Sequence, residues 1–240
     1  MATGAAPVEP TYYGEKVVSD KVVFVVDFSL SMNEEMIIDR ETIVRETGAV
    51  VTGSEEEAKA KGAPKEGEVV PIEWWKIRTR MDFARSQLKY VISTLKRDQY
   101  FDVIWYSDSV VAWQGGLVPA KPGVKLKAIQ WLDEQKCEGA TNIWGGLTKA
   151  LNLVGKGTQD ENYSRGADTI YFMSDGAPSV GDIKDPDAIV DAIERIHKVR
   201  RVKIHVAQIG TSKMPFMQKL AAVTGGNYRF FKAGEPKKKE

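Results

Sequence analysis

The sequence predicts one α/β domain with a Rossmann-like, doubly wound sheet of six mostly parallel strands, one antiparallel strand at its edge, and helices on both faces. Two observations predict this fold class. Short apolar runs alternate with longer segments of helical periodicity from residue 21 to residue 232, which is the pattern of strand–helix–strand units. The 240 residues are 42% hydrophobic and 28% charged, which suits one large globular domain.

The first third of the chain contains one clear strand and one segment that is difficult to assign. Residues 1–20 are expected to be a tail or an edge segment, and the apolar run 21–27 a buried strand. Residues 33–76 are too long for an ordinary connection inside a compact domain, so we interpret them as an insertion. Within them, Ser54 and Glu57 have the spacing of a capping box, which predicts one short helix.

From residue 79 onward the alternation is regular. Thr79 and Asp82 have the spacing of an N-cap and the third helical residue, which predicts a long helix. Asp185-Pro186 begins another helix, because Asp caps a helix and Pro fits its first position. The domain is expected to span 21–232, with 233–240 a charged tail. The remaining expected strands are 100–106, 109–113 (the antiparallel edge strand), 169–173, 202–209 and 228–231, and the remaining helices are 124–132, one following Asn142, and 216–223.

Charge, hydropathy and cysteine content exclude several classes of function. Lys plus Arg is 34 and Asp plus Glu is 33, so the formal net charge of +1 gives no support for a nucleic-acid partner or an anionic membrane surface. No run approaches the ~18 apolar residues of a membrane span, and residues 1–10 lack the pattern of a signal peptide. The single cysteine, Cys137, excludes an internal disulfide bond and favours a reducing, cytoplasmic compartment. A piece of a larger secreted protein would show the same pattern.

Oxygen-bearing side chains follow two of the predicted strands. Asp27, Ser29 and Ser31 lie at i, i+2 and i+4 at the end of the first strand, and Asp175 follows the strand that begins at residue 169. Thr141 lies in a loop before a helix. In a doubly wound sheet of order 3-2-1-4-5-6 the first and fourth strands are neighbours, so we expect Asp27 and Asp175 to meet at the carboxyl edge of the sheet. Carboxylate and hydroxyl oxygens suit a hard cation such as Mg²⁺.

These same segments resemble a known family. Three segments resemble the von Willebrand factor type A domain: Asp27-x-Ser29-x-Ser31, Gly-Ala-Thr141-Asn-Ile and Met-Ser-Asp175-Gly-Ala-Pro. Their numbered residues resemble the metal-ion-dependent adhesion site of that family. The resemblance covers residues 21–32 and 77–232 and implies a bound Mg²⁺, or alternatively Mn²⁺ or Ca²⁺. The hydroxyl ligands that it implies are those of Ser29, Ser31 and Thr141. The carboxylates of Asp27 and Asp175 would bind the ion directly or through water.

The resemblance also implies a function, that of a non-enzymatic protein-binding or adhesion module. A protein ligand would present an Asp or Glu side chain, whose carboxylate completes the coordination of the bound cation. We expect no nucleic-acid partner and a monomer in isolation. Leu30 departs from the family pattern, which very often has Gly at this position, so the loop is expected either to change shape or to carry an apolar rim.

Two other functions are left open by the sequence. The first is a structural or scaffold domain whose metal site is covered by a subunit of a larger complex or by its own insertion. The insertion carries the acidic residues Glu34, Glu35, Asp39, Glu41 and Glu46. The second is a metal-dependent hydrolase or phosphotransferase. It is disfavoured because no Gly-x-Ser-x-Gly motif is present and neither His197 nor His205 has a serine near it in the sequence.

Overall fold

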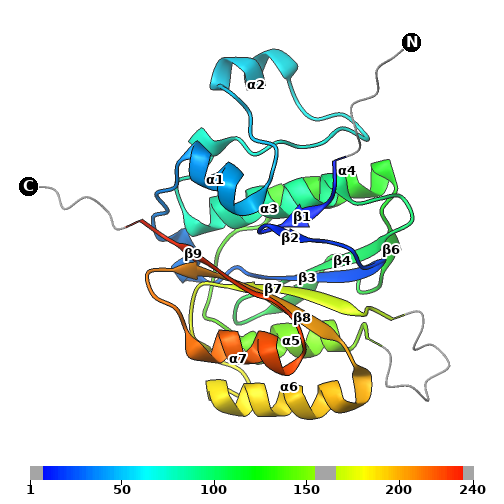
Figure 1. Cartoon of the computed structure of the whole chain (residues 1–240), viewed down its shortest axis with the longest axis vertical. Coiled ribbons are helices and arrows are strands. Elements are labelled where there is room, and N and C mark those ends of the chain that lie inside the picture. Colours follow the sequence, from blue (N-terminus) through cyan, green and yellow to red (C-terminus); the bar gives the residue numbers. More distant parts are fainter. Residues whose placement is uncertain (1–7, 155–165, 235–240) are drawn as a thin grey trace, which may run out of the picture.

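The protein is built around a mixed β-sheet, seen edge-on in a computed structural model that describes residues 8–154 and 166–234 (Figure 1). Its central strand, β3 (Lys21–Asp27), lies between β4 (Tyr100–Tyr106) and β7 (Thr169–Ser174), and all three run parallel. The strand order is β5-β4-β3-β7-β8-β9, which confirms the expected order 3-2-1-4-5-6. The outer strands are β5 (Val110–Ala112), antiparallel to β4, and the parallel strands β8 (Lys203–Gly210) and β9 (Tyr228–Lys232).

Over the described residues, the sheet has one strand more than the six that we expected. The additional strand, β6 (Val118–Pro119), pairs antiparallel with β4 on the side where β5 also pairs. A strand of two residues that contains proline has no alternation of apolar and polar residues to reveal it. Its pairing with β4 therefore could not be predicted from the sequence.

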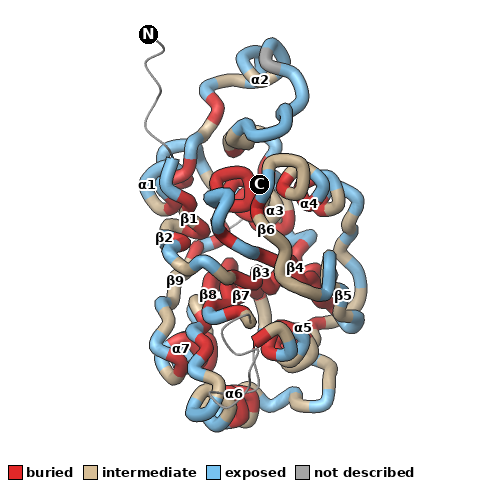
Figure 2. Tube along the Cα trace, turned by 90° about the vertical axis from the view of Figure 1, so that its right-hand side faces the viewer, coloured by how far each residue is buried: buried red, intermediate tan, exposed pale blue. Residues whose placement is uncertain are grey.

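Helices cover both faces of the sheet (Figure 1). The helices on one face are α3 (Arg80–Thr94) and α4 (Pro122–Glu134), and those on the other are α5 (Ile143–Leu151), α6 (Pro186–Arg200) and α7 (Pro215–Val223). In β3, Val22, Phe24 and Val26 belong to the core on the α3 side, whereas Val23 and Val25 belong to the core on the α5 side. Because successive side chains point to opposite faces, both covered faces require apolar residues, which explains the unbroken apolar run. The strands at the centre are accordingly buried (Figure 2).

Of residues 1–20, which we expected to be a tail or an edge segment, 1–7 lie outside the described residues and the remainder folds onto the core. Its strands β1 (Thr11–Tyr12) and β2 (Glu15–Lys16) form a separate two-stranded sheet. The turn between them carries Tyr13, whose buried ring contacts Phe83 of α3 and Phe231 of β9. These aromatic contacts join residues far apart in the sequence, which is why no local pattern predicted them.

The 33–76 segment leaves the domain and returns to it at the same place. Its start pairs with the chain just after its end, through an antiparallel bridge between Glu35 and Thr79 and a 2.9 Å hydrogen bond from the Met36 N–H to the Arg78 carbonyl. Farther out, Val51 and Ile72 form a second bridge. The segment is therefore closed twice, once at the sheet edge and once at the base of its outer arm.

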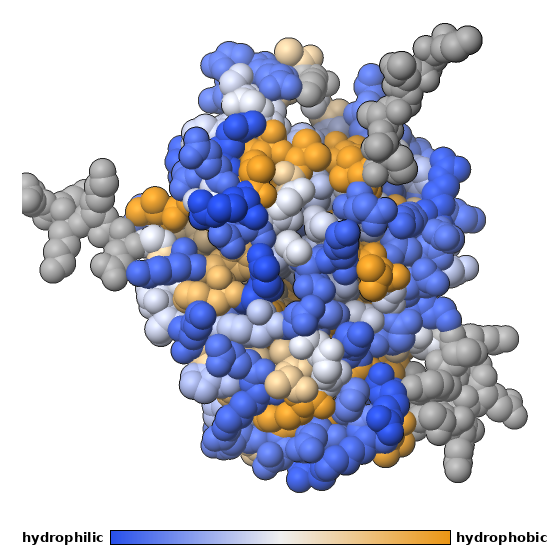
Figure 3. Space-filling model, in the orientation of Figure 1, coloured by the Kyte–Doolittle hydropathy of each residue, from blue (hydrophilic) through white to orange (hydrophobic). Residues whose placement is uncertain are grey.

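Two helices lie within this segment. The Asp39 side chain caps α1 (Arg40–Thr47), which the sequence did not predict. The capped helix expected near Ser54 is α2 (Glu55–Lys61), with the Ser54 side chain accepting a hydrogen bond from the Glu57 N–H. The arm that carries α2 projects from the body of the domain (Figure 1), and its surface is mostly hydrophilic (Figure 3). The two 3₁₀ turns at the ends of the segment are η1 (Leu30–Asn33) and η2 (Trp74–Lys76).

The C-terminal tail expected at 233–240 lies, from residue 235, outside the described residues. Among the helices of 8–154 and 166–234, none is both long and apolar enough to cross a membrane.

Candidate metal centre

The parallel pairing of β3 and β7 brings two of the predicted site residues, Asp27 and Asp175, to the same carboxyl edge of the sheet. Asp27 is the last residue of β3, and Asp175 directly follows β7. The Ser31 hydroxyl donates a 2.8 Å hydrogen bond to Asp175 Oδ1, and its oxygen lies 3.0 Å from Ser29 Oγ. A continuous polar network therefore joins the first motif to the third.

The loop that carries Thr141 is held against the same edge by backbone hydrogen bonds. The Leu30 N–H donates to the Gly139 carbonyl at 3.2 Å. Thr141 itself is fixed by Ser179, whose hydroxyl accepts from the Thr141 N–H at 3.0 Å and whose own N–H donates to the Thr141 carbonyl at 2.9 Å. Gly139 has φ +66°, and a Cβ there would lie 2.3 Å from a carboxylate oxygen of Asp108, so glycine is required at this point. In the described part of the chain, the Thr141 hydroxyl forms no hydrogen bond, which leaves its oxygen available to a ligand.

Asp27 is completely buried at the centre of the network. Its Oδ1 accepts from the Ser29 N–H at 2.9 Å, and its Oδ2 accepts from the Ser174 hydroxyl at 2.6 Å and from the Tyr106 hydroxyl at 3.4 Å. Burial, followed by the nearby charge of Asp175, raises the pKa of Asp27 to about 6. At neutral pH the carboxylate is ionised although its surroundings disfavour the charge, and a cation beside it would relieve this cost.

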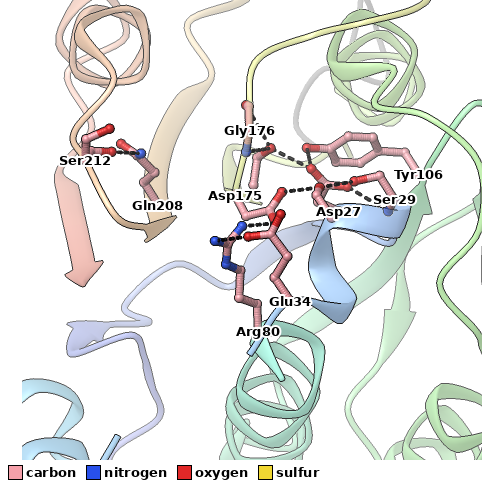
Figure 4. A network of polar contacts seen from close by, with 11 residues as sticks. Asp27, Ser29, Glu34, Arg80, Tyr106, Asp175, Gly176, Gln208 and Ser212 are labelled. Atoms are coloured by element: carbon pink, nitrogen blue, oxygen red, sulfur yellow. Dashed lines mark hydrogen bonds and ion pairs between the residues drawn. The ribbon is translucent and has the colours of Figure 1, made fainter. Parts of the chain in front are cut away.

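An arginine lies beside the second carboxylate, which the sequence did not predict. Arg80, the first residue of α3, is 7% exposed. Its Nη1 lies 2.8 Å from Asp175 Oδ2, and its Nη2 lies 2.5 Å from Glu34 Oε2 (Figure 4). Burial raises the pKa of Asp175, and the hydrogen bonds from Arg80 and Ser31 oppose this rise. The sequence contains one indication that Arg80 lies near the site. Arg80 follows Thr79, the N-cap of α3, and the insertion that precedes α3 begins just after Ser31.

The donor set fits a hard divalent cation. Two carboxylates and three hydroxyls provide only oxygen atoms, which suit Mg²⁺, Mn²⁺ or Ca²⁺ better than softer metals. Over residues 8–154 and 166–234 no group of three or more His, Cys, Asp or Glu side chains could hold a metal ion, so a zinc centre of the usual kind finds no ligands there. Any cation at this edge would depend on the hydroxyls of Ser29, Ser31 and Thr141 in addition to the two carboxylates.

The acidic side chains of the insertion lie mostly away from this edge. The Asp39 carboxylate accepts a 2.8 Å hydrogen bond from the Thr42 N–H in α1. Glu46 lies against Arg45 and Arg229, at 3.0 and 3.8 Å. Glu34 alone among the insertion acids is linked to the site within the described residues, and it is linked through Arg80. Leu30, between the two serines, is 59% exposed, so it forms an apolar rim instead of folding inward.

Neither histidine supports a nucleophilic serine at this edge. His197 forms a 2.8 Å hydrogen bond from Nδ1 to the Val202 carbonyl oxygen. His205 stacks on Tyr171, with ring centroids 5.0 Å apart. Among the described residues, no hydrogen bond joins either ring to Ser29 or Ser31, so the arrangement needed for serine activation is not present there.

The family model and the similar proteins found by comparison all point to the same family. A model of the von Willebrand factor type A domain matches residues 76–230. The chain is 24% identical over 131 residues to von Willebrand factor A domain-containing protein 3A from Homo sapiens, covering 53% of this chain and 10% of that protein. It is 28% identical over 98 residues to inter-alpha-trypsin inhibitor heavy chain H1 from Bos taurus, covering 40% of this chain and 11% of that protein. The chain thus spans about a tenth of the length of these relatives.

Solved structures share the fold. The crystal structure of the SpRpn10 VWA domain superposes with a TM-score of 0.52 at 14% identity, covering 90% of this chain and 89% of that chain. Proximal thread matrix protein 1 from the mussel byssus gives a TM-score of 0.50 at 16% identity, covering 88% of this chain and 41% of that chain. At such low identity the likeness concerns the fold alone. The α/β architecture with helices on both faces is the feature that these chains have in common.

Proposed function

The chain belongs to the von Willebrand factor type A domain family, and from that premise we propose that it is a non-enzymatic protein-binding module that depends on a divalent cation. The residues that would hold the cation are Asp27, Ser29, Ser31, Thr141 and Asp175. When bound, the cation would supply a positive charge with a coordination position open to an Asp or Glu carboxylate of a protein partner.

One observation supports this proposal most strongly. Two buried carboxylates, Asp27 and Asp175, lie at the carboxyl ends of neighbouring strands, and the charge of Asp175 adds to the effect of burial in raising the pKa of Asp27. Arg80 pairs with one oxygen of Asp175, but no basic side chain among the described residues pairs with Asp27, although a buried carboxylate is costly without a compensating charge. Hydroxyls that can rotate surround both carboxylates, and the Ser31 hydroxyl bridges Asp175 to Ser29. Such a cluster is suited to binding a cation, because its hydroxyls can turn their lone pairs towards it.

The surface beside the candidate centre suggests what the partner presents. Leu30 is exposed directly between Ser29 and Ser31. A partner whose acidic residue is flanked by an apolar side chain would therefore bury that side chain against Leu30 while its carboxylate approaches the cation. The carboxylate supplies the charge, and the apolar neighbour adds specificity.

The scaffold alternative has one observation in its favour. Glu34, at the start of the insertion, lies against Arg80 at the edge of the centre. The insertion thus contributes a carboxylate near the place where a partner would bind. It contacts the guanidinium and not the hydroxyls of the candidate ligands, so the open adhesion site remains the better supported function.

The first experiment measures thermal stability of the whole chain with Mg²⁺ and with a chelator. We expect Mg²⁺ to raise the melting temperature of the wild type, because a ligand that binds the folded state alone stabilises it, by about 2.7 kcal/mol at 100 times its Kd. The isosteric variant Asp27→Asn should lose this response. Asp102→Asn is the matched control, since Asp102 is also a buried carboxylate and lies outside the site; it should keep the Mg²⁺ response. Absence of a response in a well-folded wild type would refute cation dependence.

A second experiment separates binding from catalysis. The immobilised chain is exposed to peptides that carry Asp or Glu beside a Leu, with Mg²⁺ or with chelator, and capture should require Mg²⁺. The same preparation is tested for turnover of generic phosphate and ester substrates. Turnover that disappears in Ser29→Ala would overturn the binding-module proposal in favour of a hydrolase.

A further inference from the structure

We infer that Arg80 is a resident cation of this centre, which competes with the divalent cation for Asp175, and that Glu34 is the alternative partner that Arg80 retains when Asp175 is taken. This inference rests on the proposed cation dependence and adds two residues to the centre that the family motif does not contain. It makes the affinity for the divalent cation adjustable from the base of the insertion.

Asp175 is shared between two sets of partners. Its Oδ1 accepts the hydrogen bond from Ser31, a candidate ligand of the divalent cation, at 2.8 Å. Its Oδ2 faces Arg80 Nη1 at 2.8 Å. The Asp175 side chain is completely buried and that of Arg80 is 9% exposed, so water screens their charges poorly. A second cation at Asp175 would meet the guanidinium charge at close range, and the two positive charges would oppose each other.

The backbone holds Arg80 in this place. Its N–H donates to the Glu34 carbonyl at 3.0 Å, and the preceding residue, Thr79, forms a capping box with Asp82 at the start of α3. The guanidinium itself is incompletely satisfied, since Arg80 Nε is buried without a hydrogen-bond partner among the described residues. The backbone of Arg80 is thus fixed, while its side chain divides its donors between two carboxylates.

Glu34 is the exposed member of the trio. Its side chain is 60% exposed, and it lies at the C-cap of the short turn η1, outside any regular element. Its charge acts in two ways that have the same sign. It adds negative potential beside the centre, and it holds the guanidinium away from exclusive pairing with Asp175. Both effects favour a divalent cation at Asp175.

Competition and simple structural support therefore predict different results. If Arg80 only supports the fold, removing its charge lowers stability and leaves Mg²⁺ affinity unchanged or weaker. If Arg80 competes, removing its charge lowers the stability of the cation-free protein and strengthens Mg²⁺ binding. Removing the Glu34 charge should have the opposite effect on Mg²⁺ binding and weaken it.

Calorimetric titration of the whole chain with Mg²⁺ alone tests the inference. R80Q should bind Mg²⁺ roughly tenfold more tightly than wild type, within the usual range of coupling between sites. E34Q should bind it several-fold more weakly, and this weakening should shrink in the double variant R80Q/E34Q, because Glu34 acts partly through Arg80. K89Q is the matched control, since Lys89 is also a cation of α3 but pairs with Asp133; its Mg²⁺ affinity should equal that of wild type.

Each outcome bears on a separate claim. If wild type and all variants fail to bind Mg²⁺, the proposed function falls and the inference falls with it. If wild type binds Mg²⁺ and R80Q binds it equally or more weakly, Arg80 is not a competitor although the proposed function stands. If R80Q does not fold, E34Q decides, because Glu34 is mostly exposed and its substitution leaves the core intact: an affinity equal to wild type would overturn the inference.

Discussion

Two buried carboxylates in this protein, Asp102 in β4 and Asp27 at the end of β3, are equally inaccessible to water and differ in what surrounds them. Asp102 accepts backbone N–H hydrogen bonds from Val103, Gln114 and Gly116 at 2.8, 3.1 and 3.0 Å. Asp27 accepts one backbone N–H, is otherwise hydrogen-bonded to side-chain hydroxyls, and lies near a second carboxylate. Burial raises the pKa of both. Burial by itself therefore does not distinguish a functional carboxylate from a structural one.

The partners make the distinction. Backbone N–H groups in the loop after β5 are fixed donors, and they give Asp102 a single role, which is to hold that loop against β4. Hydroxyls at the β3 edge can rotate to donate or to accept, so the surroundings of Asp27 can reorganise when a cation arrives. Each prediction below tests whether the two carboxylates differ in this way.

The largest effect is expected from Asp102→Ala. Three backbone donors would lose their partner, and an unsatisfied buried donor costs about 1–3 kcal/mol. Because water can reach part of the loop and satisfy some of these donors, we expect the free energy of unfolding to fall by about 2–4 kcal/mol in total. Urea unfolding with Mg²⁺ and with chelator measures this loss. The stabilisation by Mg²⁺ should be the same as in wild type. A loss of that stabilisation would show that the two regions are coupled and would break the comparison.

A smaller effect, on cation affinity alone, is expected from Thr141→Ala. Removing a hydroxyl from the centre should weaken Mg²⁺ binding by about tenfold, the lower end of the range for groups that support metal ligands. Thr141→Ser retains the oxygen and should bind Mg²⁺ nearly as wild type does. Calorimetric titration measures both variants. Equal Mg²⁺ affinities in the Ala and Ser variants would show that the Thr141 hydroxyl is not a ligand. In chelator, the free energy of unfolding of either variant should be nearly that of wild type.

The smallest effect is a dependence of stability on pH. The pKa of Asp27 in the folded protein, about 6, lies above its ordinary value of 3.8, so the folded state binds this proton more tightly than the unfolded chain. The resulting stabilisation is present at low pH and is lost as the pH rises through about 6. In chelator, Asp27 should lower the free energy of unfolding by about 1 kcal/mol between pH 5 and pH 7.

The difference between wild type and Asp27→Asn isolates this contribution from those of other titrating groups. The pH slope of the variant should be shallower by that amount. Saturating Mg²⁺ should also flatten the slope of the wild type, since the cation binds the ionised carboxylate. Parallel pH profiles for the two proteins in chelator would show that Asp27 is not the titrating group.

Much of the fold was predictable from local patterns. The apolar run of β3 and the capping residues Thr79 and Asp82 of α3 are signals within a few residues of one another, and the structure confirms both elements. The order of the sheet followed from the doubly wound rule, which places the first and fourth strands together when the antiparallel edge strand is counted as the third. The proximity of Asp27 and Asp175 followed from that order, and the structure bears it out.

Other features depend on contacts that no local pattern encodes. The short strand β6 forms by pairing with β4. The hairpin of β1 and β2 is held by Tyr13, which packs against aromatic rings of α3 and β9. The α1 helix has Asp39 as a cap but a run of charged and β-branched residues, which gave no clear helical periodicity.

The sequence by itself determined the architecture and the chemical types at the candidate centre, because the periodicity of apolar residues and the positions of oxygen side chains at strand ends are local properties. Only the tertiary structure decided the charge balance of that centre. Glu34 lies at the start of the long insertion and Arg80 shortly after its end, and they meet because Glu35 and Thr79 pair with each other beside the sheet edge. Electrostatic interaction depends on distance and burial and not on separation along the chain. The positive charge of Arg80 beside Asp175 therefore became visible only when the chain was folded.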